Sequence, residues 1–543
     1  MQPLDTARRE LLKLGGLGLA AAAAPTAYIA AQNRAHPAAP AAHILAPLFY
    51  DVRTYGATGD GKTYDTAALN KAIAACADAG GGTVYVPAGN YLCYTIHLRS
   101  NVELYLAQGS VIIAAETPAE GATSGPTTGY DAPEPNTAWD AYQDFGHNHW
   151  HNSLMWGEDL HDLSITGPGL IWGKGLSAGH GNRPLPSGVG NKSIALKNCR
   201  NVQLRDFSVK KGGHFALLLT AVDVLKVDGL TLDTDRDGMD IDCCHNVHVS
   251  NCTVNSPEDD GICLKSSYGL GYARACDNIT ITNCFVTARY EIGTLIDGTV
   301  KPVQMANNKM SNGRMKAGTE SNGGFRNISI SNCVFDHSRG LALESADGAI
   351  LEDIVVSNIT MRDAPDTPLF LRLCARMRGP ADAKVGTLRR VKIRNVSSYN
   401  STGLYPAIIA GIPGALIEDI SLSDIYFHKV GGADKKIADA EPDEQKNGYP
   451  DPTRFPTMFP AHGLFLRHIR NLEMTNIEFR LDKPDARPAI WAHDVDGLDI
   501  FRLRTPPATG AANFYLRDVT NFRLFGCPQI PDKIITKADS ISF

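Results

Sequence analysis

Acidic side chains cluster in two short segments, DTDRDGMDID at 233–242 and SPEDDGICLKSS at 256–267. Carboxylates held close together repel one another, which raises the pKa of at least one of them. A protonated carboxyl can donate a proton to a leaving oxygen while an ionised neighbour activates water, which is the chemistry of glycosidic bond cleavage. The candidate catalytic residues are Asp237, Asp259 and Asp260. Asp235 and Asp240 also fit positions that cap turns.

A repeat surrounds these segments and must position them. Copies with alternating apolar and polar residues include NVHVSNCTV at 246–254, NITITNCFV at 278–286 and NISISNCVF at 327–335. The first apolar residues of six copies lie at positions 202, 224, 247, 279, 328 and 354, so the steps are 22, 23, 32, 49 and 26 residues. A period of two within each copy indicates strands, and a base period of this length with insertions indicates a solenoid.

The repeat predicts an all-β fold, a right-handed parallel β-helix of about ten to twelve coils. Each short coil has room for strands and corners but none for a crossover helix, and the LxxLxL spacing of a leucine-rich horseshoe is absent. One helix is predicted over 66–79, with Asp65 as its cap and Gly80–Gly82 at its end. Its apolar face, expected to cover an open end of the β-helix, consists of Leu69, Ala72, Ile73 and Cys76.

Coils that keep register would stack the carboxylates. Asp237 lies 13 residues after Val224, and Asp260 lies 13 residues after Val247. The two side chains should therefore be one strand spacing apart, about 4.8 Å between backbones. The same arithmetic predicts two further stacked groups, Asp259 with Glu291, and Asp242 with Lys265 and Asp297.

The N-terminus has the features of an export signal. Ala-Arg-Arg-Glu-Leu-Leu-Lys at 7–13 precedes a Gly/Ala/Leu stretch that ends near Pro25, the pattern of a twin-arginine signal. We expect cleavage near Ala30–Ala31, a periplasmic or secreted protein, and no membrane span in the mature chain. The predicted organisation is a signal at 1–31, an Ala/Pro linker at 32–46 and a single β-helix domain at 47–543.

Twelve cysteines would fit disulfides in an exported protein, but their placement indicates free thiols. Four of them follow an asparagine within apolar runs, as small buried hydrophobic residues do: Cys199, Cys252, Cys284 and Cys333. We expect most of the twelve to be free and buried. Pairing remains open for Cys243, Cys244, Cys263 and Cys276, and no spacing suggests zinc.

Two segments carry a resemblance to a known family. YDVRTYGATGDGKTYDTAALNKAIAACADAGGGTVYVPAGNYL (50–92) is similar to the N-terminal coil and cap of pectin-degrading β-helices. RDGMDIDCCHNVHVSNCTVNSPEDDGICLKSS (236–267) is similar to the segment between an Asn-x-Asp-Gly and an Asp-Asp-Cys-Ile-Ala motif. Over 49–530 the chain thus resembles the polygalacturonase family of glycoside hydrolases. The resemblance implies that Asp259 is the general acid, that Asp237 and Asp260 position and deprotonate water, and that hydrolysis inverts the anomeric centre.

Two family motifs are missing from their expected places. Where Gly-His-Gly should follow the paired Asp, the sequence reads ARYEIGTLIDG at 288–298, with Tyr290 or Glu291 at the His position. The Arg-Ile-Lys motif, which in the family binds the sugar carboxylate, corresponds to Ala342-Leu343-Glu344. A glutamate there argues against a uronic acid at that subsite. The expected substrate-binding residues are Lys265, Glu291, His214, Arg339 and Tyr290.

Large insertions interrupt the repeat at 113–150, 299–325 and 431–462, and such excursions usually build binding walls. The part at 434–456 is predicted to be a solvated loop that matters only if it folds back over the groove. Several walls would close the groove and favour an exo-acting enzyme. The first insertion ends near His147, His149 and His151, for which a sugar-binding rim or a surface patch is favoured over a metal. Trp150, Trp156 and Trp172 could stack on pyranose rings or belong to the core.

Composition limits the partners. The 543 residues are 43% hydrophobic with a formal net charge of −6, so no basic footprint for nucleic acid is present. We expect a monomer with a polysaccharide or oligosaccharide substrate and neither metal nor cofactor. The leading hypothesis is an exported, inverting glycoside hydrolase acting on a pectin-like glycan. The alternatives are a β-helical polysaccharide lyase, whose acidic strip would bind calcium, and a non-catalytic carbohydrate-binding β-helix.

Overall fold

The computed structural model describes residues 49–117, 129–143, 145–179, 185–186, 188–305, 310–506 and 511–543. Pro47–Phe543 form one compact unit. The predicted export signal at 1–31 and the linker at 32–46 lie outside the described residues, so both stay predictions.

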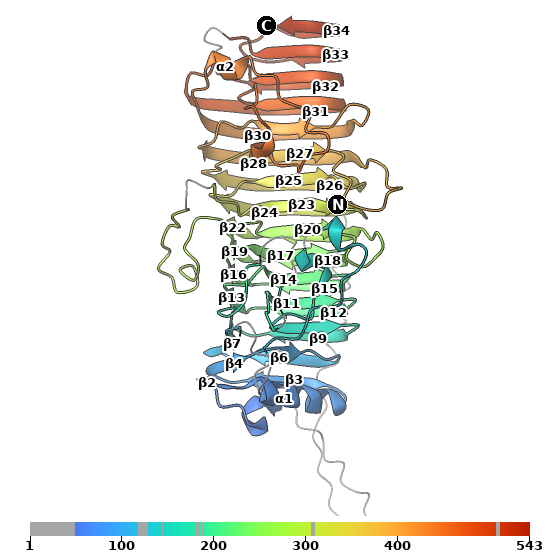
Figure 1. Ribbon diagram of the computed structural model, residues 1–543. Coiled ribbons are helices and arrows are strands. Elements are labelled where there is room, and N and C mark those ends of the chain that lie inside the picture. Colours follow the sequence, from blue (N-terminus) through green and yellow to red (C-terminus); the bar gives the residue numbers. More distant parts are fainter. Residues whose placement is uncertain are drawn as a thin grey trace, which may run out of the picture. The chain divides into compact units, whose positions relative to one another are not determined.

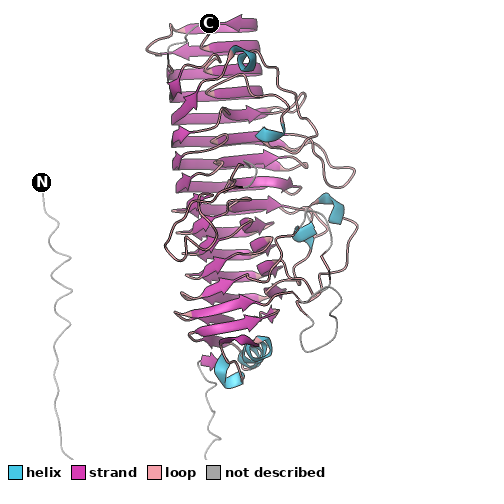
Figure 2. Cartoon of the chain, turned by 60° about the vertical axis from the view of Figure 1, so that its left-hand side comes forward, coloured by secondary structure: helices cyan, strands magenta, loops and turns pink. Residues whose placement is uncertain are grey.

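Three ladders of parallel strands, here called A, B and C, run the length of this unit (Figures 1 and 2). Ladder A contains β5 (Ile96–His97), β8 (Met155–Glu158), β11 (Lys192–Lys197), β14 (Phe215–Thr220), β17 (Asp237–Asp242), β20 (Ile262–Ser266), β23 (Met315–Ser321), β25 (Leu341–Ser345), β27 (Leu369–Leu373) and β29 (Ala407–Ala410). Ladder B begins with β1 (Phe49–Asp51), β3 (Gly82–Val86), β6 (Val102–Leu106), β9 (His161–Thr166), β12 (Arg200–Arg205), β15 (Asp223–Asp228), β18 (His245–Ser250) and β21 (Cys276–Thr282). Ladder C begins with β2 (Asp60–Tyr64), β4 (Gly89–Cys93), β7 (Ser110–Ala114), β10 (Leu170–Trp172), β13 (Ser208–Lys210), β16 (Thr231–Asp233), β19 (Thr253–Asn255) and β22 (Phe285–Thr287).

Toward the C-terminus the ladders merge into long strands that turn the corners without a break. These are β24 (Phe325–Asp336), β26 (Ile350–Arg362), β28 (Thr387–Ser401), β30 (Ile417–Gly431), β31 (Leu464–Lys483), β32 (Ile490–Arg504) and β33 (Phe514–Phe525). The predicted all-β, right-handed parallel β-helix is confirmed.

Inward-facing residues stack from coil to coil and form the core. In ladder A, Met239 lies opposite Ile262, and Ile262 lies opposite Met315. All three are at most 1% exposed. The alternation of the repeat therefore sends one set of side chains inward and leaves the other set outside, where chemistry is possible.

Asparagines at the corners adopt the left-handed backbone conformation. Asn246 and Asn278 have φ values of 57° and 59°, and the Asn278 amide donates to Asn246 Oδ1 at 3.1 Å. The cysteines that follow such asparagines are buried in the core. All twelve cysteines are free, and only Cys527 is not fully buried, so no disulfide joins Cys243, Cys244, Cys263 or Cys276.

One corner breaks the asparagine pattern and carries a stability prediction. Val224 has a φ of 55° and is 46% exposed, between Asn201 and Asn246 of the adjacent coils. A β-branched residue is strained in this conformation, so Val224→Asn should raise the free energy of unfolding by about 1 kcal/mol. Chemical denaturation of the two proteins measures the difference. Val334 is 45% exposed without a positive φ, so Val334→Asn is the matched control; an equal gain in both variants would contradict the strain argument.

Each end of the β-helix is covered. Helix α1 (Thr66–Asp78) buries its predicted apolar face against the first coils, and β34 (Lys533–Ser542) pairs antiparallel with β33 at the other end (Figure 1). The predicted capping role of Asp65 is wrong, because its carboxylate accepts from the backbone N–H of Thr58 at 2.7 Å rather than from the helix. Asp65 thus fixes the preceding turn.

The remaining helical segments are short and lie in loops. They are the 3₁₀ turns Val52–Tyr55, Asp140–Tyr142, Phe145–Asn148 and Pro452–Arg454, and helix α2 (Lys435–Ala438). Among the described residues, no helix combines the length and hydropathy needed to span a bilayer.

The second insertion lies earlier in the chain than predicted. Strand β23 occupies Met315–Ser321, so the insertion between β22 and β23 spans 288–314 rather than 299–325. The repeat did not reveal β23 because MKAGTES lacks the apolar alternation of the other copies. This missed coil shifts every register prediction made beyond it.

Candidate active site

Asp237, Asp259 and Asp260 meet at one edge of ladder A. Asp237 begins β17, and Asp260 lies two residues before β20. One oxygen of each carboxylate lies within 4.8 Å of the other two, and the backbone N–H of Asp260 donates to Asp237 Oδ1 at 3.1 Å. The predicted convergence of these three side chains is confirmed, whereas their individual chemical roles stay predictions.

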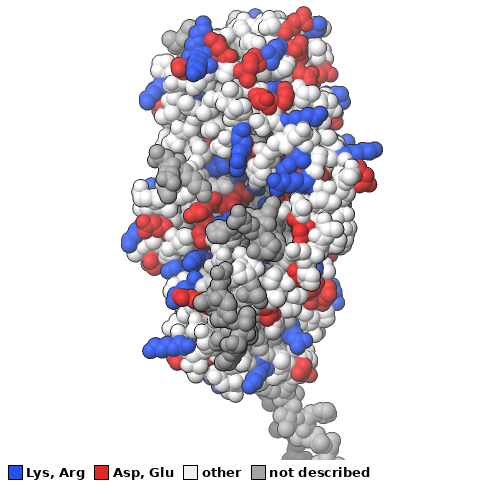
Figure 3. Space-filling view, in the orientation of Figure 1, with Lys and Arg blue, Asp and Glu red and all other residues white. Residues whose placement is uncertain are grey.

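The carboxylates lie in a small pocket of about 130 Å³ that also contains four basic side chains. Arg236 Nη2 lies 2.7 Å from Asp259 Oδ2, and Lys316 Nζ lies 2.5 Å from Asp260 Oδ2. The lining residues are His147, Arg236, Asp237, Asp259, Asp260, Lys265, Lys316, Glu320, Arg378 and Tyr449. Acidic and basic side chains also lie side by side over the middle coils of the face shown in Figure 3.

Two of the carboxyls have pKa values shifted in opposite directions. Burial raises the pKa of Asp237 well above its ordinary value, and the charges of Asp259 and Asp240 raise it further. For Asp259, burial opposes ionisation, but Arg236 and Lys316 outweigh it and lower the pKa. The opposite shifts favour a protonated carboxyl beside an ionised one, the arrangement that acid–base catalysis requires.

The two lysines of the pocket remain charged. Burial alone would lower the pKa of Lys316, but Asp260 raises it well above its ordinary value. Lys265 behaves in the same way beside Glu320, whose Oε2 lies 2.9 Å from Lys265 Nζ. Both ammonium groups can therefore hold an anionic ligand group.

Lys265 is the one predicted substrate-binding residue that lines this pocket. It lies opposite Asp242 in the pairing of β17 with β20, as the offset arithmetic predicted. Asp297 does not continue that ladder: it lies in the 288–314 insertion, where its carboxylate accepts from Thr299. The offset fails there because the insertion separates β22 from the next strand of ladder A.

Tyr290 and Glu291 lie in the same insertion and do not line the pocket. The Tyr290 backbone N–H donates to Asn255 Oδ1 at 3.2 Å, and that of Glu291 donates to the Lys301 carbonyl at 2.8 Å. The prediction that Glu291 stacks beside Asp259 is wrong, because the rung that follows β20 belongs to β23.

His214 and Arg339 also lie outside the pocket lining. His214 is buried behind the pocket, with Nδ1 2.7 Å from Arg236 Nη1. Arg339 is bound by the buried Asp366 and lies 2.8 Å from Asp451 Oδ1. In this structure both side chains therefore support neighbouring residues instead of facing the pocket.

His147 is a pocket residue whose partner the sequence did not reveal. It reaches ladder A from the first insertion, and its Nε2 lies 2.8 Å from Asp240 Oδ2. Burial opposes the charged imidazole, but Asp240 raises the pKa of His147. The turn role considered for Asp240 is wrong, because this residue lies within β17 and binds a histidine 93 positions away. No local sequence pattern marks a contact of that separation.

The Arg–apolar–Lys pattern that the resemblance implies is present one coil earlier than predicted, as Arg314-Met315-Lys316. Lys316 pairs with Ala342 in the adjacent strand, so the predicted correspondence with Ala342–Glu344 falls one coil too late. Glu344 is buried and accepts from Thr319 Oγ1 at 2.9 Å. It does not line the pocket, which removes the basis for the argument against a uronic acid.

The third insertion folds back over the outer face of ladder A. Tyr449 lines the pocket, and Phe455 and Phe459 pack against Phe370 and Phe465 of β27 and β31. Most residues of the predicted loop at 434–456 are exposed or partly exposed, but burial of Phe455 and the neighbouring Phe459 folds the loop back against ladder A, which is the condition set for a functional role. The groove is covered on the C-terminal side of the pocket.

The first insertion contributes His147 to the pocket lining. Gln143 Oε1 accepts from the Tyr268 backbone N–H at 2.9 Å, which fixes the segment that carries His147. Trp150 is buried beneath Lys197, whose Nζ lies 4.4 Å from the ring centre. The predicted tryptophans, Trp150, Trp156 and Trp172, all lie outside the pocket lining.

Comparison with known proteins gives consistent matches. A family model described as "Rhamnogalacturonase A/epimerase, pectate lyase-like" matches residues 49–127. A "Probable polygalacturonase" from Vitis vinifera is 23% identical over 302 residues, which cover 51% of this chain and 58% of that protein. The chain therefore spans little more than half the length of this relative.

Two solved structures share the fold. The family 28 exopolygalacturonase of Yersinia enterocolitica matches with a TM-score of 0.59 and 18% identity, over 85% of this chain and 79% of that one. The hyperthermoactive exopolygalacturonase of Thermotoga maritima matches with a TM-score of 0.57 and 17% identity, over 80% and 92%. The chain is thus similar in sequence to polygalacturonases, and it shares the β-helix fold of two exopolygalacturonases.

Proposed function

We propose that the chain is an exported glycoside hydrolase that cleaves O-glycosidic bonds in a pectin-like polysaccharide or oligosaccharide. The observation that carries the proposal is the Asp237–Asp259–Asp260 cluster, in which two carboxyls have opposite pKa shifts. A structural role gains nothing from three carboxylates in contact, whereas acid–base hydrolysis needs them. Export rests on the N-terminal twin-arginine pattern, and the protein is proposed to act as a monomer.

The basic lining supports an acidic sugar as substrate. The lining contains four Lys and Arg side chains, and burial favours the neutral form of Asp237 among its carboxyls. A uronic acid carboxylate would add a negative charge to this lining, and Arg236, Lys316, Lys265 and Arg378 are its candidate partners. Ion pairs in so small a pocket are only weakly screened by water, so this charge match contributes strongly to selectivity.

Binding of such a substrate would also determine which carboxyl of the cluster carries the catalytic proton. For Asp259 to act as general acid, its ion pair with Arg236 must open, because that pair keeps Asp259 ionised. The carboxylate of a uronic acid competes with Asp259 for Arg236 and so raises the pKa of Asp259. The proton then passes from Asp237 to Asp259, which donates it to the leaving oxygen, while Asp237 and Asp260 deprotonate the water.

Inversion of the anomeric centre is part of the proposal through the family resemblance. Carboxylate oxygens 4.8 Å or less apart can share one water molecule. This separation is shorter than the roughly 6.5–9.5 Å typical of inverting carboxyl pairs, so the geometry alone does not assign the outcome. Proton NMR of the first-formed anomer decides it.

Exo action fits the covered groove. Tyr449 lines the pocket, and packing of Phe455 and Phe459 holds its loop against ladder A, so we expect this loop to block a long chain on the C-terminal side. We therefore propose release of short products from a chain end. Product profiles on polygalacturonate should show monomers or dimers from the first minutes, without intermediate-length oligomers.

The activity is tested with a panel of polygalacturonate, rhamnogalacturonan and their oligomers. Hydrolysis should release reducing sugars without ultraviolet absorbance from an unsaturated end. Absorbance that rises with each cleavage would identify a lyase, and binding without turnover of every glycan would support the non-catalytic alternative. The spectrum is a better discriminator than a chelator, since it reports the bond chemistry directly.

The opposite pKa shifts predict a bell-shaped pH profile of kcat/KM. Activity should fall as the pH rises through the raised pKa of Asp237, because the cluster then loses its proton. It should also fall at low pH through the lowered pKa of Asp259, where the ionised partner becomes protonated. Initial rates across the acidic and neutral range measure the profile. A kcat/KM that falls neither at low pH nor at high pH would contradict a catalytic cluster.

A further inference from the structure

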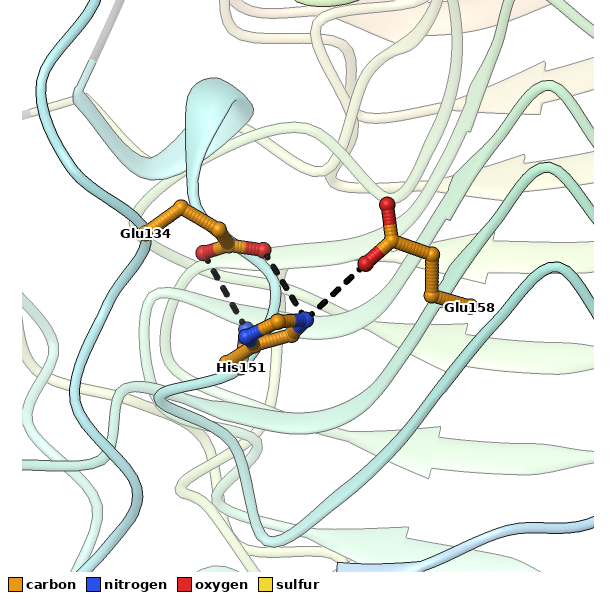
Figure 4. A group of neighbouring side chains, drawn as sticks. All are labelled: Glu134, His151 and Glu158. Carbon is orange, nitrogen blue, oxygen red and sulfur yellow. Dashed lines mark hydrogen bonds and ion pairs between the residues drawn. The ribbon is translucent and has the colours of Figure 1, made fainter.

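A second group of ligand-type side chains lies outside the pocket, where the first insertion meets ladder A. His151 Nε2 lies 3.0 Å from Glu158 Oε2 and 3.5 Å from Glu134 Oε1 (Figure 4). Glu158 ends β8, whereas Glu134 and His151 belong to the insertion. A sugar-binding rim or a surface patch was predicted here rather than a metal. The chain separates Glu134 from His151 by 17 positions, so only folding brings them together.

The Nε2 atom of His151 lies close to the carboxylates of both Glu134 and Glu158, and its single N–H can donate a good hydrogen bond to only one of them. An imidazole N–H donates along one direction, yet the two acceptor oxygens come from different segments. A tetrahedral site with metal–ligand bonds of about 2.0–2.1 Å has donor atoms roughly 3.3 Å apart. The two measured separations bracket that value, and the three donor atoms lie within 4.8 Å of one another.

The donors are held in place by other groups. Both oxygens of Glu134 accept from the Trp150 backbone N–H, at 3.1 and 2.9 Å. Lys197 Nζ binds the second oxygen of Glu158 at 2.8 Å, which leaves Oε2 directed at His151. The ring of Trp156 stacks on that of His151 with centres 3.8 Å apart. Such supporting contacts orient ligands before an ion binds.

We propose that Glu134, His151 and Glu158 bind a divalent transition-metal ion of the zinc class, which fastens the first insertion to β8. One imidazole and two carboxylates suit zinc, whereas calcium and magnesium prefer an all-oxygen shell. The donors are 16–27% exposed, so water can supply a fourth ligand. His147 lies four residues before His151, and the ion therefore stabilises the segment that reaches the carboxylate pocket.

The test is uptake of Zn²⁺ by the full chain after dialysis against a chelator. Competition with a chromophoric chelator near neutral pH should show one saturable equivalent per folded chain, with a rise in the melting temperature. His151→Gln and Glu158→Gln should each weaken binding more than the roughly 100-fold that loss of a supporting contact costs. Mg²⁺ and Ca²⁺ should produce no comparable shift.

A second histidine with two carboxylates provides the matched control. His337 lies beside Asp336 and Asp363, but Arg289 and Arg362 neutralise that group, so His337→Gln should leave uptake unchanged. Circular dichroism of the metal-free variants verifies that they fold. Absence of a saturable equivalent in the wild type, retained affinity in both ligand variants, or loss in His337→Gln would each overturn the proposal.

Discussion

Asp259→Asn and Asp237→Asn should each lower kcat by about 10³-fold on oligogalacturonides, within the range that loss of a general acid or base produces. Each change removes one member of a cluster in which the pKa of Asp237 is raised and that of Asp259 is lowered, with carboxylate oxygens within 4.8 Å of one another. Asn keeps the shape of the side chain, so KM should change much less than kcat. Steady-state kinetics on purified protein measures both constants.

A substrate with a good leaving group distinguishes the roles of Asp259 and Asp237. An aryl glycoside with a good leaving group needs no protonation, so activity toward it should survive in the variant that lacks the general acid. We expect that survival in Asp259→Asn and not in Asp237→Asn. Asp228→Asn, on the exposed side of β15, is the control and should retain wild-type kinetics. Wild-type activity in both cluster variants would exclude the proposed chemistry.

Lys316→Met should have the second-largest effect, because it removes the partner of a buried carboxylate. Lys316 is 5% exposed and its Nζ lies 2.5 Å from Asp260 Oδ2. Breaking a buried ion pair costs about 3–5 kcal/mol, so the free energy of unfolding should fall by that amount. Chemical denaturation at neutral pH measures the loss.

The same substitution should change the pH profile. Lys316 is one of the charges that lower the pKa of Asp259, so without it that pKa rises and the acidic limb moves to higher pH. Affinity for uronic acid oligomers should fall as well. Lys316→Arg keeps the charge and should restore the acidic limb; an unshifted limb in Lys316→Met would show that this lysine does not act on the cluster.

The repeat made the architecture predictable. Alternation at Val247, Val249, Ile279 and Ile281 fixes which side chains point inward, and Asn at the corners fixes the bends. Because coils of nearly equal length stack in register, the same pattern also placed Asp237 over Asp260. Strand alternation, corner residues and the stacking of adjacent coils depend only on residues close in the chain or one coil apart, so the sequence is enough to predict them.

The predicted strand register was wrong where the coil length changed. The insertion at 288–314 misplaced Glu291 and Asp297, and it concealed Lys316 on strand β23. An offset count assumes that each coil returns to the same place after a fixed number of residues. An insertion removes that assumption, and the length of a loop does not tell where its ends return to the ladder.

The sequence alone predicted the parallel β-helix, its helical cap and the convergence of three aspartates. Each of these depends on residue spacing within one coil or between neighbouring coils. Only the tertiary structure brought His147, Lys316 and Tyr449 to those aspartates and Glu134 to His151. His147 and Tyr449 reach ladder A from distant insertions, Lys316 returns to the ladder after an insertion, and Glu134 meets His151 within one insertion. Packing of the whole insertion against the ladder decides where such side chains lie, and no period in the sequence encodes it.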